Sequence, residues 1–427
     1  MNKIIKPIDH LSGEICLPGD KSISHRTVFL GSISEGRTEA QNFLEAEDCL
    51  HTAEAFRSMG IDVNIKDRRI SVTGKGLTGL SSPKGSLYLG NSGTTMRLLP
   101  GILSGQNFKA VLTGDESLQK RPMKRIIAPL QKMGVNIKSK NSDDKPPLVI
   151  TGGKVIPAEH SLLIATAQVK SCILFAGLFA DGVTTVTEPF QSRDHTERLL
   201  SLFGGKLTRK NLTVSIKGRA SLTGSKFFIP GDISSAAFFI GASCVLKGSE
   251  LLIRDVGLNP TRLGFIDALL EMGANIRIEN EKKSVEPYGD IRVKFALLKP
   301  IVVEKKNIPL LIDEIPILAV VASACDGKSV IKGVGELKFK ETDRIASIIE
   351  NLQKMGIKSA IEGEDLTIVG NPKRVNAANF ESFGDHRTAM SMAMAALRST
   401  GECEIKNTDC VNTSFPEFFE ILEHLKR

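Results

Sequence analysis

The chain has 427 residues, of which 41% are hydrophobic and 24% charged, and its formal net charge is +8. This length exceeds one ordinary hydrophobic core, so we expect two or three domains of a globular protein. The N-terminal residues lack the apolar core of a secretory signal, and no apolar run reaches the ~18–20 residues of a membrane span. We therefore expect a cytoplasmic protein that does not bind membranes.

The remaining composition bears on metals, disulfides and partners. The seven cysteines form no CxxC pair and stand mostly in apolar runs, which favours buried free thiols. The seven histidines show no spacing such as HxxxH, so no metal is expected. A positive charge suits either nucleic acid or a small anionic substrate. The absence of Trp and of any run of five Lys or Arg favours the small anion.

A pattern of about 70 residues occurs six times along the chain. Each copy opens at a loop-to-helix junction, continues into an apolar helix and ends with a second helix, often closed by Met-Gly or Gly-Gly. Two to three strands accompany the two helices of each copy, which predicts α/β units stacked side by side. The six openings are Asp20, Asn91, Thr166, Asp232, Asp313 and Asp385.

The helices follow in pairs, with strands before and after each pair. Residues 281–307, which are rich in Lys, are interpreted as an insertion that lengthens the fourth copy. The expected helices cover residues 24–34, 47–60, 95–105, 123–134, 169–182, 196–205, 236–248, 261–273, 315–327, 343–356, 387–401 and 415–425.

The tripeptide Pro-Gly-Asp occurs at residues 18–20 and 230–232, each time after an extended stretch. Three copies of the pattern lie between the two tripeptides and three follow the second. We therefore expect two three-copy domains, the first over residues 20–232 and the second over residues 1–19 and 233–427. The chain would cross between them at the two tripeptides, and the basic junctions would face a common cleft.

The first two copies place polar groups at helix starts. Lys21, Ser22 and Arg26 surround one start, where backbone N–H groups and two cations favour an anion; the alternative is a capped helix with solvated charges. Gly93 would let the backbone approach a ligand, or it marks a tight turn. Arg121 precedes a proline that fixes its geometry, or it belongs to a solvated charge run.

The later copies add hydroxyl, amide and acidic groups. Thr166 and Gln168 could bind sugar-like hydroxyls or phosphate. Asp313 is either a helix cap or a base for a substrate hydroxyl. The segment from Lys340 to Arg344 is either a surface salt-bridge cluster or a carboxylate tuned by cations. His386 is interpreted as a supporting residue beside Arg387.

The basic residues at these junctions imply two separate anionic groups, hence two phosphorylated or carboxylated substrates. Those that would converge are Lys21, Arg26, Arg121, Lys340, Arg344 and Arg387.

Seven segments resemble, in order, the motifs of the 5-enolpyruvylshikimate-3-phosphate (EPSP) synthase family, the 3-phosphoshikimate 1-carboxyvinyltransferases. They are LPGDKSISHR, LGNSGTTMR, QKRPM, TAQVKS, DEIP, KETDR and GDHRTAM. The resemblance spans nearly the whole chain. It implies an α/β fold of two domains, each of three βαβαββ repeats in an inside-out barrel. It also implies transfer of the enolpyruvyl group of phosphoenolpyruvate to the 5-hydroxyl of shikimate 3-phosphate, with release of phosphate and without a cofactor.

The resemblance also assigns roles to single residues. Asp313 would take the hydroxyl proton, Glu341 would protonate the vinyl carbon, and Lys21 would touch both substrates. Shikimate 3-phosphate would bind to Lys21, Ser22, Arg26, Thr166, Ala167, Gln168, Arg193, Asp313 and Lys340. Phosphoenolpyruvate would bind to Lys21, Asn91, Gly93, Arg121, Gln168, Glu341, Arg344 and Arg387. The fourth copy would supply no ligand.

Two positions depart from the family pattern. Thr413 stands where many members have Lys, and Thr166 where they often have Ser. Gly93 is the position at which a larger side chain would crowd glyphosate, so we expect sensitivity to that inhibitor.

Two alternatives stay open on the sequence. UDP-N-acetylglucosamine enolpyruvyl transferase shares the implied fold, but that family carries a reactive Cys in the loop corresponding to residues 115–121, where this chain has none. A non-catalytic RNA-binding repeat protein would use the same basic junctions. The preferred interpretation is a monomer that acts on small molecules and binds no nucleic acid.

Overall fold

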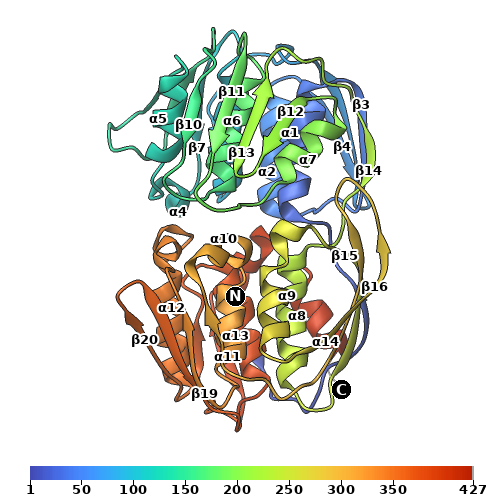
Figure 1. The fold of residues 1–427 in the computed structure, drawn as a ribbon, viewed down its shortest axis with the longest axis vertical. Helices are drawn as coiled ribbons and strands as arrows, with labels where there is room; N and C mark the ends of the chain where they lie inside the picture. Colours follow the sequence, from blue (N-terminus) through green and yellow to red (C-terminus); the bar gives the residue numbers. More distant parts are fainter. Residues whose placement is uncertain (426–427) are drawn as a thin grey trace. The chain divides into compact units, whose positions relative to one another are not determined.

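The computed structural model describes residues 1–425 of the chain. The chain divides into two compact units. One, here called the continuous unit, is Gly19–Ile229; the other, the split unit, combines Met1–Pro18 with Pro230–Arg427. Figure 1 labels the elements of both units along the sequence colours.

The continuous unit contains three four-stranded sheets built to one plan. In each, the first two strands are parallel and the remaining pairs are antiparallel. The first sheet is β14 (Lys226–Phe228), β3 (Glu35–Gln41), β5 (Arg69–Lys75) and β4 (Asp62–Lys66). The second is β6 (Leu87–Tyr88), β7 (Lys109–Thr113), β9 (Leu148–Thr151) and β8 (Asn136–Ser139). The third is β10 (Glu159–Ser161), β11 (Val183–Thr187), β13 (Thr213–Lys217) and β12 (Lys206–Lys210).

Three helices of the continuous unit are buried on nearly every side, although each carries polar or charged residues near its start. They are α1 (Lys21–Ile33), α3 (Gly93–Leu103) and α6 (Ala167–Gly177). Helices α3 and α6 approach closely at Gly101, where a Cβ would lie 2.2 Å from the carbonyl oxygen of Cys172. The amphipathic helices α2 (Glu47–Ser58), α5 (Lys124–Lys132) and α7 (His195–Leu202) and the short α4 (Glu116–Gln119) complete the unit.

The split unit repeats this plan twice and varies it once. Its sheets are β2 (Ser12–Cys16), β15 (Glu250–Gly257), β17 (Tyr288–Lys294) and β16 (Asn275–Lys282); β18 (Val302–Val303), β19 (Gly327–Ile331), β21 (Asp365–Gly370) and β20 (Lys358–Glu362); and the three-stranded β1 (Lys3–Ile5), β23 (Cys403–Lys406) and β22 (Asn379–Glu381). In the last sheet the N-terminal strand β1 pairs antiparallel with β23.

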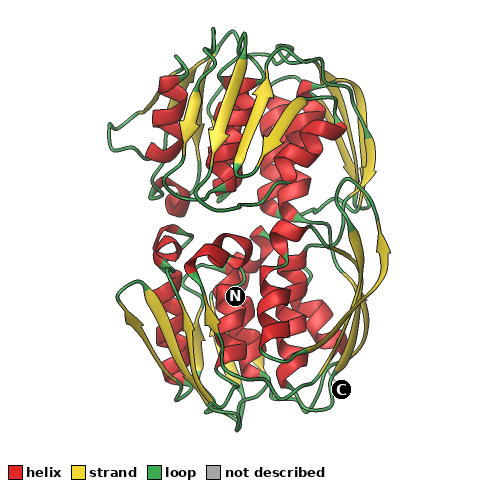
Figure 2. Ribbon diagram, in the orientation of Figure 1, coloured by secondary structure: helices red, strands yellow, loops and turns green. Residues whose placement is uncertain are grey.

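The inner helices of the split unit are α8 (Ile233–Val245), α11 (Ile315–Ala322) and α13 (His386–Ala396). Every residue of α11 and α13 is buried. Its other helices are α9 (Gly264–Glu271), α10 (Ile308–Leu311), α12 (Arg344–Lys354), α14 (Phe418–Leu425) and the 3₁₀ helices η1 (Pro260–Arg262), η2 (Lys305–Asn307), η3 (Gly335–Phe339) and η4 (Thr408–Thr413). In each unit the sheets surround a group of helices (Figure 2).

Two strands belong to one unit although the helix that follows each of them in the chain belongs to the other unit. β2 comes just before α1 in the chain, yet it pairs with β15 of the split unit, with Ile15 opposite Ile253. Likewise β14 comes just before α8, yet it pairs with β3 of the continuous unit. The chain therefore passes between units after each of these strands, at the two Pro-Gly-Asp tripeptides. The continuous unit is made of three βαβαββ repeats and the split unit of two such repeats and one with three strands, in the α/β arrangement that the resemblance implied.

The expected insertion at residues 281–307 is wrong. It contains β17, which lies between β15 and β16 and is a regular strand of the fourth repeat. Its inward residues Ile291 and Val293 are fully buried, whereas Arg292 and Lys294 alternate with them on the outer face. This alternation is that of a half-buried strand, and the charged face obscured it.

Several inner helices also begin earlier than predicted. Helix α1 starts at Lys21 rather than residue 24, α6 at Ala167 rather than 169, and α13 at His386 rather than 387. The polar residues of these junctions therefore lie in the first helical turn, where the backbone N–H groups are unpaired within the helix. Within residues 1–425, no helix is long and apolar enough to span a membrane. All seven cysteines are free thiols, and five of them are buried.

Candidate active site

The start of α1 brings a cation close to a carboxylate. Asp20 caps the helix, because its Oδ1 accepts the N–H of Ile23 at 2.9 Å. Lys21, the first helical residue, donates through Nζ to Oδ2 of Asp48 on α2 at 3.0 Å. Ser22 follows, half-buried, with its carbonyl oxygen accepting a bond from Arg26 Nη1 at 2.9 Å. This helix start is capped, and its charges are held rather than solvated.

Arg26 ties three helices of the continuous unit together. Its side chain is buried, with Nε donating to Thr196 Oγ1 at 2.6 Å and Nη2 to Ser171 Oγ at 3.0 Å. Ser171 lies on α6 and Thr196 on α7. Arg26, which is predicted to bind phosphate, therefore has a side chain of fixed orientation. This limits the rotamer entropy that it would lose when an anion binds.

A second cationic group forms at the start of α3. Arg121 Nη2 donates to Asn91 Oδ1 at 2.6 Å, and Asn91 Nδ2 donates to Asp115 Oδ2 at 2.7 Å. A Cβ on Gly93 would lie 2.9 Å from Nη1 of both Arg121 and Arg97. Gly93 is the first residue of α3 and has no positive φ, so the turn of this segment lies just before it, at Gly90 and Asn91. Glycine is needed here because two guanidinium groups approach the backbone.

Arg97 is a residue that the sequence argument missed. Its Nη1 donates to Gln168 Oε1 at 2.9 Å, and Gln168 Nε2 donates to Thr94 Oγ1 at 3.3 Å. These bonds join the first turns of α3 and α6, where Thr166 and Ala167 also lie. Arg97 is four residues after Gly93, which is one helical turn, and this spacing could have identified it.

The junction before α7 is supported by a buried ion triad. Lys170 Nζ lies 2.7 Å from Glu188 Oε2 and 2.8 Å from Glu197 Oε1. Burial lowers the pKa of Lys170, but the two carboxylates outweigh it and the net pKa is raised. The half-buried Arg193 lies between these two glutamates in the chain. Asp194 makes no capping bond to α7 and instead pairs with Arg198 at 2.8 Å.

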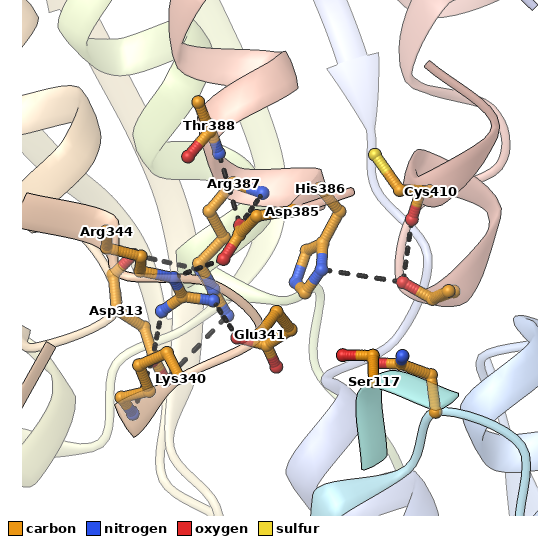
Figure 3. Close-up of polar contacts among 12 residues, drawn as sticks. Ser117, Asp313, Lys340, Glu341, Arg344, Asp385, His386, Arg387, Thr388 and Cys410 are labelled. Atoms are coloured by element: carbon orange, nitrogen blue, oxygen red, sulfur yellow. Dashed lines mark hydrogen bonds and ion pairs between the residues drawn. The ribbon is translucent and has the colours of Figure 1, made fainter. Parts of the chain in front are cut away.

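In the split unit, Arg344 is held by three carboxylates (Figure 3). Its Nε donates to Asp385 Oδ2 at 2.7 Å, its Nη2 to Glu341 Oε2 at 2.5 Å and its Nη1 to Asp313 Oδ1 at 3.3 Å. The Arg344 side chain is 1% exposed, so this is no surface salt-bridge cluster. Burial alone would lower the pKa of the guanidinium, yet the carboxylates raise it above its usual range.

Asp313 is the point where the cations of this unit meet. Besides Arg344, Lys340 Nζ lies 3.3 Å from its Oδ1, and Arg387 Nη2 lies 3.8 Å from its Oδ2. Arg387 Nη1 also donates to the Asp313 carbonyl oxygen at 3.2 Å. Glu314, at the N-cap position of α11, makes no capping bond. The DEIP carboxylates thus face cations instead of capping the helix.

His386 and Thr413 complete the group. Thr413 Oγ1 lies 3.4 Å from His386 Nδ1 and donates to the Cys410 carbonyl at 2.7 Å. Thr413 is therefore a neighbour of the α13 start. Within residues 1–425, no three His, Cys, Asp or Glu side chains are grouped to hold a metal ion.

The sequence-predicted residues thus fall into two groups, each at helix starts of a three-repeat unit. Asn91, Gly93, Arg121 and Gln168 are linked in one, and Asp313, Lys340, Glu341, Arg344 and Arg387 in the other. The cations of these groups are suited to phosphorylated or carboxylated ligands, and the carboxylates beside them to moving protons.

The fold is that of the enolpyruvyl transferases. The structure superposes on the enolpyruvyl transferase NikO from Streptomyces tendae with a TM-score of 0.81 at 18% identity, covering 99% and 96% of the two chains. It superposes on EPSP synthase from Acinetobacter baumannii with a TM-score of 0.88 at 42% identity, covering 100% and 98%.

Sequence similarity narrows the class further. Residues 5–422 match the family described as EPSP synthase (3-phosphoshikimate 1-carboxyvinyltransferase). Relatives named 3-phosphoshikimate 1-carboxyvinyltransferase are 48% identical in Petrotoga mobilis, over 99% of both chains, and 46% identical in Desulforamulus reducens, over 100% of this chain and 99% of that one. The chain belongs to the EPSP synthase family.

Proposed function

We propose that the protein transfers the enolpyruvyl group of phosphoenolpyruvate to the 5-hydroxyl of shikimate 3-phosphate and releases phosphate. In the cell this reaction supplies the precursor of chorismate and the aromatic amino acids. The proposal rests on membership of the family together with the residues described above. One observation carries it: the guanidinium of Arg344 bonds both Asp313 and Glu341, the two carboxylates expected to move protons.

The chemistry needs one group to remove a proton and another to supply one. The hydroxyl of shikimate 3-phosphate attacks C2 of phosphoenolpyruvate while the CH₂ carbon takes a proton. A tetrahedral ketal phosphate forms, and it then loses a proton and phosphate. Asp313 takes the hydroxyl proton and Glu341 gives one to the CH₂ carbon. The Asp313 and Glu341 side chains are 14% and 17% exposed, so both are open to a ligand while remaining in a cationic surrounding.

The cations stabilise the anionic substrates. Arg344, Arg387 and Lys340 surround Asp313, so an incoming phosphate or carboxylate would replace carboxylates of the protein as their partner. In the continuous unit, Lys21, Arg26 and Arg193 bind the phosphate of shikimate 3-phosphate, with Ser22, Thr166, Ala167 and Gln168 contacting its remaining polar groups. Asn91, Gly93 and Arg121 bind phosphoenolpyruvate.

The test is release of phosphate from phosphoenolpyruvate with and without shikimate 3-phosphate. Release only when the acceptor is present supports the proposal. Release with UDP-N-acetylglucosamine instead would favour the alternative acceptor. RNA binding that weakens steeply with salt, without any phosphate release, would favour the non-catalytic alternative.

Location, assembly and domain movement belong to the same proposal. The substrates are soluble metabolites, and we assign the enzyme to the cytoplasm as a monomer. Sedimentation at several concentrations tests the monomer, since a mass that rises with concentration contradicts it. We also propose that binding both substrates compacts the protein; small-angle scattering that is unchanged by both ligands would oppose this.

A further inference from the structure

A buried polar cluster outside the assigned residues joins the fourth and fifth repeats of the chain, in the split unit. Its members are Asp232 and Ser234 at the start of α8, Arg262 in η1 and Glu314 before α11. Arg262 and Glu314 have side chains that are 2% and 1% exposed. Burying charged groups is unfavourable unless they are well paired, so their arrangement requires a reason.

Glu314 lies between two guanidinium groups. Its Oε1 is 4.0 Å from Nη2 of Arg262 and 3.9 Å from Nη1 of Arg387. The hydroxyl of Ser234 donates to the same oxygen of Glu314. The carboxylate is thus anchored from α8, and its negative charge is shared between the two arginines.

Arg262 is anchored on its other side as well. Its Nη2 donates to Ser234 Oγ at 2.6 Å and to Asp232 Oδ1 at 3.3 Å. Asp232 also caps α8 by accepting the N–H of Ser234 at 2.8 Å. The anchoring side of the cluster is therefore tied to a helix start and cannot turn without breaking the cap.

Arg387 has two acidic neighbours of different character. Asp313, whose side chain is 14% exposed, also forms ion pairs with Lys340 and Arg344. It is the residue proposed to take the hydroxyl proton. The Glu314 side chain is 1% exposed, and the two arginines near it, Arg262 and Arg387, are buried as well. When Asp313 exchanges its partners for a substrate, Glu314 is the counter-charge that stays with Arg387.

We infer that Glu314 is a positioning residue, which acts through Arg387. Anchored by Ser234 and Arg262, it holds the Arg387 guanidinium in the orientation that pairs with an anionic group of phosphoenolpyruvate, while Asp313 stays available for the hydroxyl proton. The fourth repeat, which supplies no direct ligand, thereby supports the site. This inference rests on the proposed function.

The test compares Glu314→Gln with wild type in the phosphate-release assay. Gln keeps the size of the side chain and can still accept from Ser234, but it lacks the charge. We expect KM for phosphoenolpyruvate to rise about tenfold or more, with a smaller fall in kcat and little change in KM for shikimate 3-phosphate. If Glu314 had a purely structural role, the substitution would lower the amount of folded enzyme without raising the KM for phosphoenolpyruvate more than the KM for shikimate 3-phosphate.

The matched control is Asp290→Asn. Like Glu314, Asp290 is a buried carboxylate of the split unit near an arginine, and it lies 2.7 Å from Arg254. Unlike Glu314, it lies on strand β17 and not at a helix start. Its loss should leave both KM values unchanged. A double-mutant cycle with Arg387→Lys adds a second readout: if Glu314 acts through Arg387, the two effects on KM do not multiply.

The outcomes separate the inference from the function. If wild type releases no phosphate with both substrates, the proposed function fails and takes the inference with it. If wild type is active but Glu314→Gln has an unchanged KM for phosphoenolpyruvate, or the cycle shows independent effects, the inference alone is overturned. Should Glu314→Gln not fold, Ser234→Ala removes the anchor of the carboxylate, and it must raise the same KM, by a smaller factor, for the inference to stand.

Discussion

Arg344 and Asp385 form a fully buried ion pair, with Nε 2.7 Å from Oδ2. The other carboxylate oxygen of Asp385 accepts the N–H groups of Arg387 at 2.8 Å and Thr388 at 3.2 Å. One carboxylate therefore caps α13 and also fixes the guanidinium to which Asp313 and Glu341 are bonded. Stability and the geometry of the proton-transfer groups depend on the same side chain.

The first prediction concerns this pair. Asp385→Ala should lower the free energy of unfolding by about 3–5 kcal/mol, because it removes a cap and leaves a buried cation short of charge. Urea unfolding followed by circular dichroism measures it. Asp343→Asn is the control, since Asp343 caps α12 through Oδ1 and Asn caps equally well. Equal losses in the two variants would contradict the role of the ion pair.

Proton transfer gives the second prediction. Asp313→Asn and Glu341→Gln should each lower kcat by about 10²–10⁴, the usual contribution of a general acid or base. Both retain the size of the side chain, so binding of shikimate 3-phosphate measured by calorimetry should persist. Glu350→Gln, on the exposed face of α12 beside Lys354, should keep wild-type turnover. Near-normal kcat in either site variant removes its assigned role.

A methyl group at residue 93 tests the narrow space between Arg121 and Arg97. Because the added Cβ would lie 2.9 Å from both guanidinium groups, Gly93→Ala must displace them by several tenths of an ångström. We expect a higher KM for phosphoenolpyruvate and weaker inhibition by glyphosate, measured in the same assay. Gly85→Ala, where a Cβ meets nothing within 4 Å, is the control. Wild-type turnover that is unaffected by glyphosate in large excess over phosphoenolpyruvate would show that the expected sensitivity is absent.

Two histidines of the continuous unit predict a loss of stability in acid. Burial, and then the charges of Lys21 and Arg26, hold the pKa of His25 well below its usual range. Burial and then Lys132 lower the pKa of His160 to about 4. Below about pH 6.5 the unfolded chain gains protons that the folded protein does not, so stability falls as the pH drops. Each group contributes about 1.4 kcal/mol per pH unit in that range.

The pH effect can be isolated by substitution. Urea unfolding at pH 7 and pH 5.5 measures the loss for wild type and for His25→Gln. The variant should be less stable at pH 7, because packing is lost, but its further loss at pH 5.5 should be smaller than that of wild type by about 1 kcal/mol. An equal further loss would mean that His25 takes up its proton in the folded state.

The buried triad gives the last prediction. Lys170→Met leaves Glu188 and Glu197 buried together without their cation, so we expect a loss of about 3–5 kcal/mol in unfolding free energy. Lys210→Met, at an exposed position of β12, should change stability by less than about 0.5 kcal/mol. If both lysine variants unfold alike, the triad contributes nothing particular to the continuous unit.

Much of the fold could be predicted from periodicity. Helix α11 is a continuous apolar run in the sequence, and six mostly apolar helices at similar spacing indicate six α/β repeats. The error at β17 arose because Asp290 and Arg292 interrupt its apolar residues. A half-exposed strand alternates, and charges on its outer face are easily mistaken for a loop.

The site was partly predictable for a related reason. Lys21, Arg344 and Arg387 stand in the first turn of their helices, where anions are favoured, and that local rule identified them. Arg97 and Arg262 follow their junctions by a helical turn or more. Glu314 had an ordinary local explanation as a cap, which the structure contradicts.

The amino-acid sequence alone therefore established the six repeats, the basic helix starts and the family, because these depend on local pattern and on motifs in order. The partners of each charge came from the folded chain. Asp385 lies 41 residues from Arg344, and Ser234 lies 80 residues from Glu314, yet each pair is in hydrogen-bonding contact. Such pairs form where helices from different repeats pack in one unit, and burial then makes each pairing necessary, since an unpaired buried charge would be too costly.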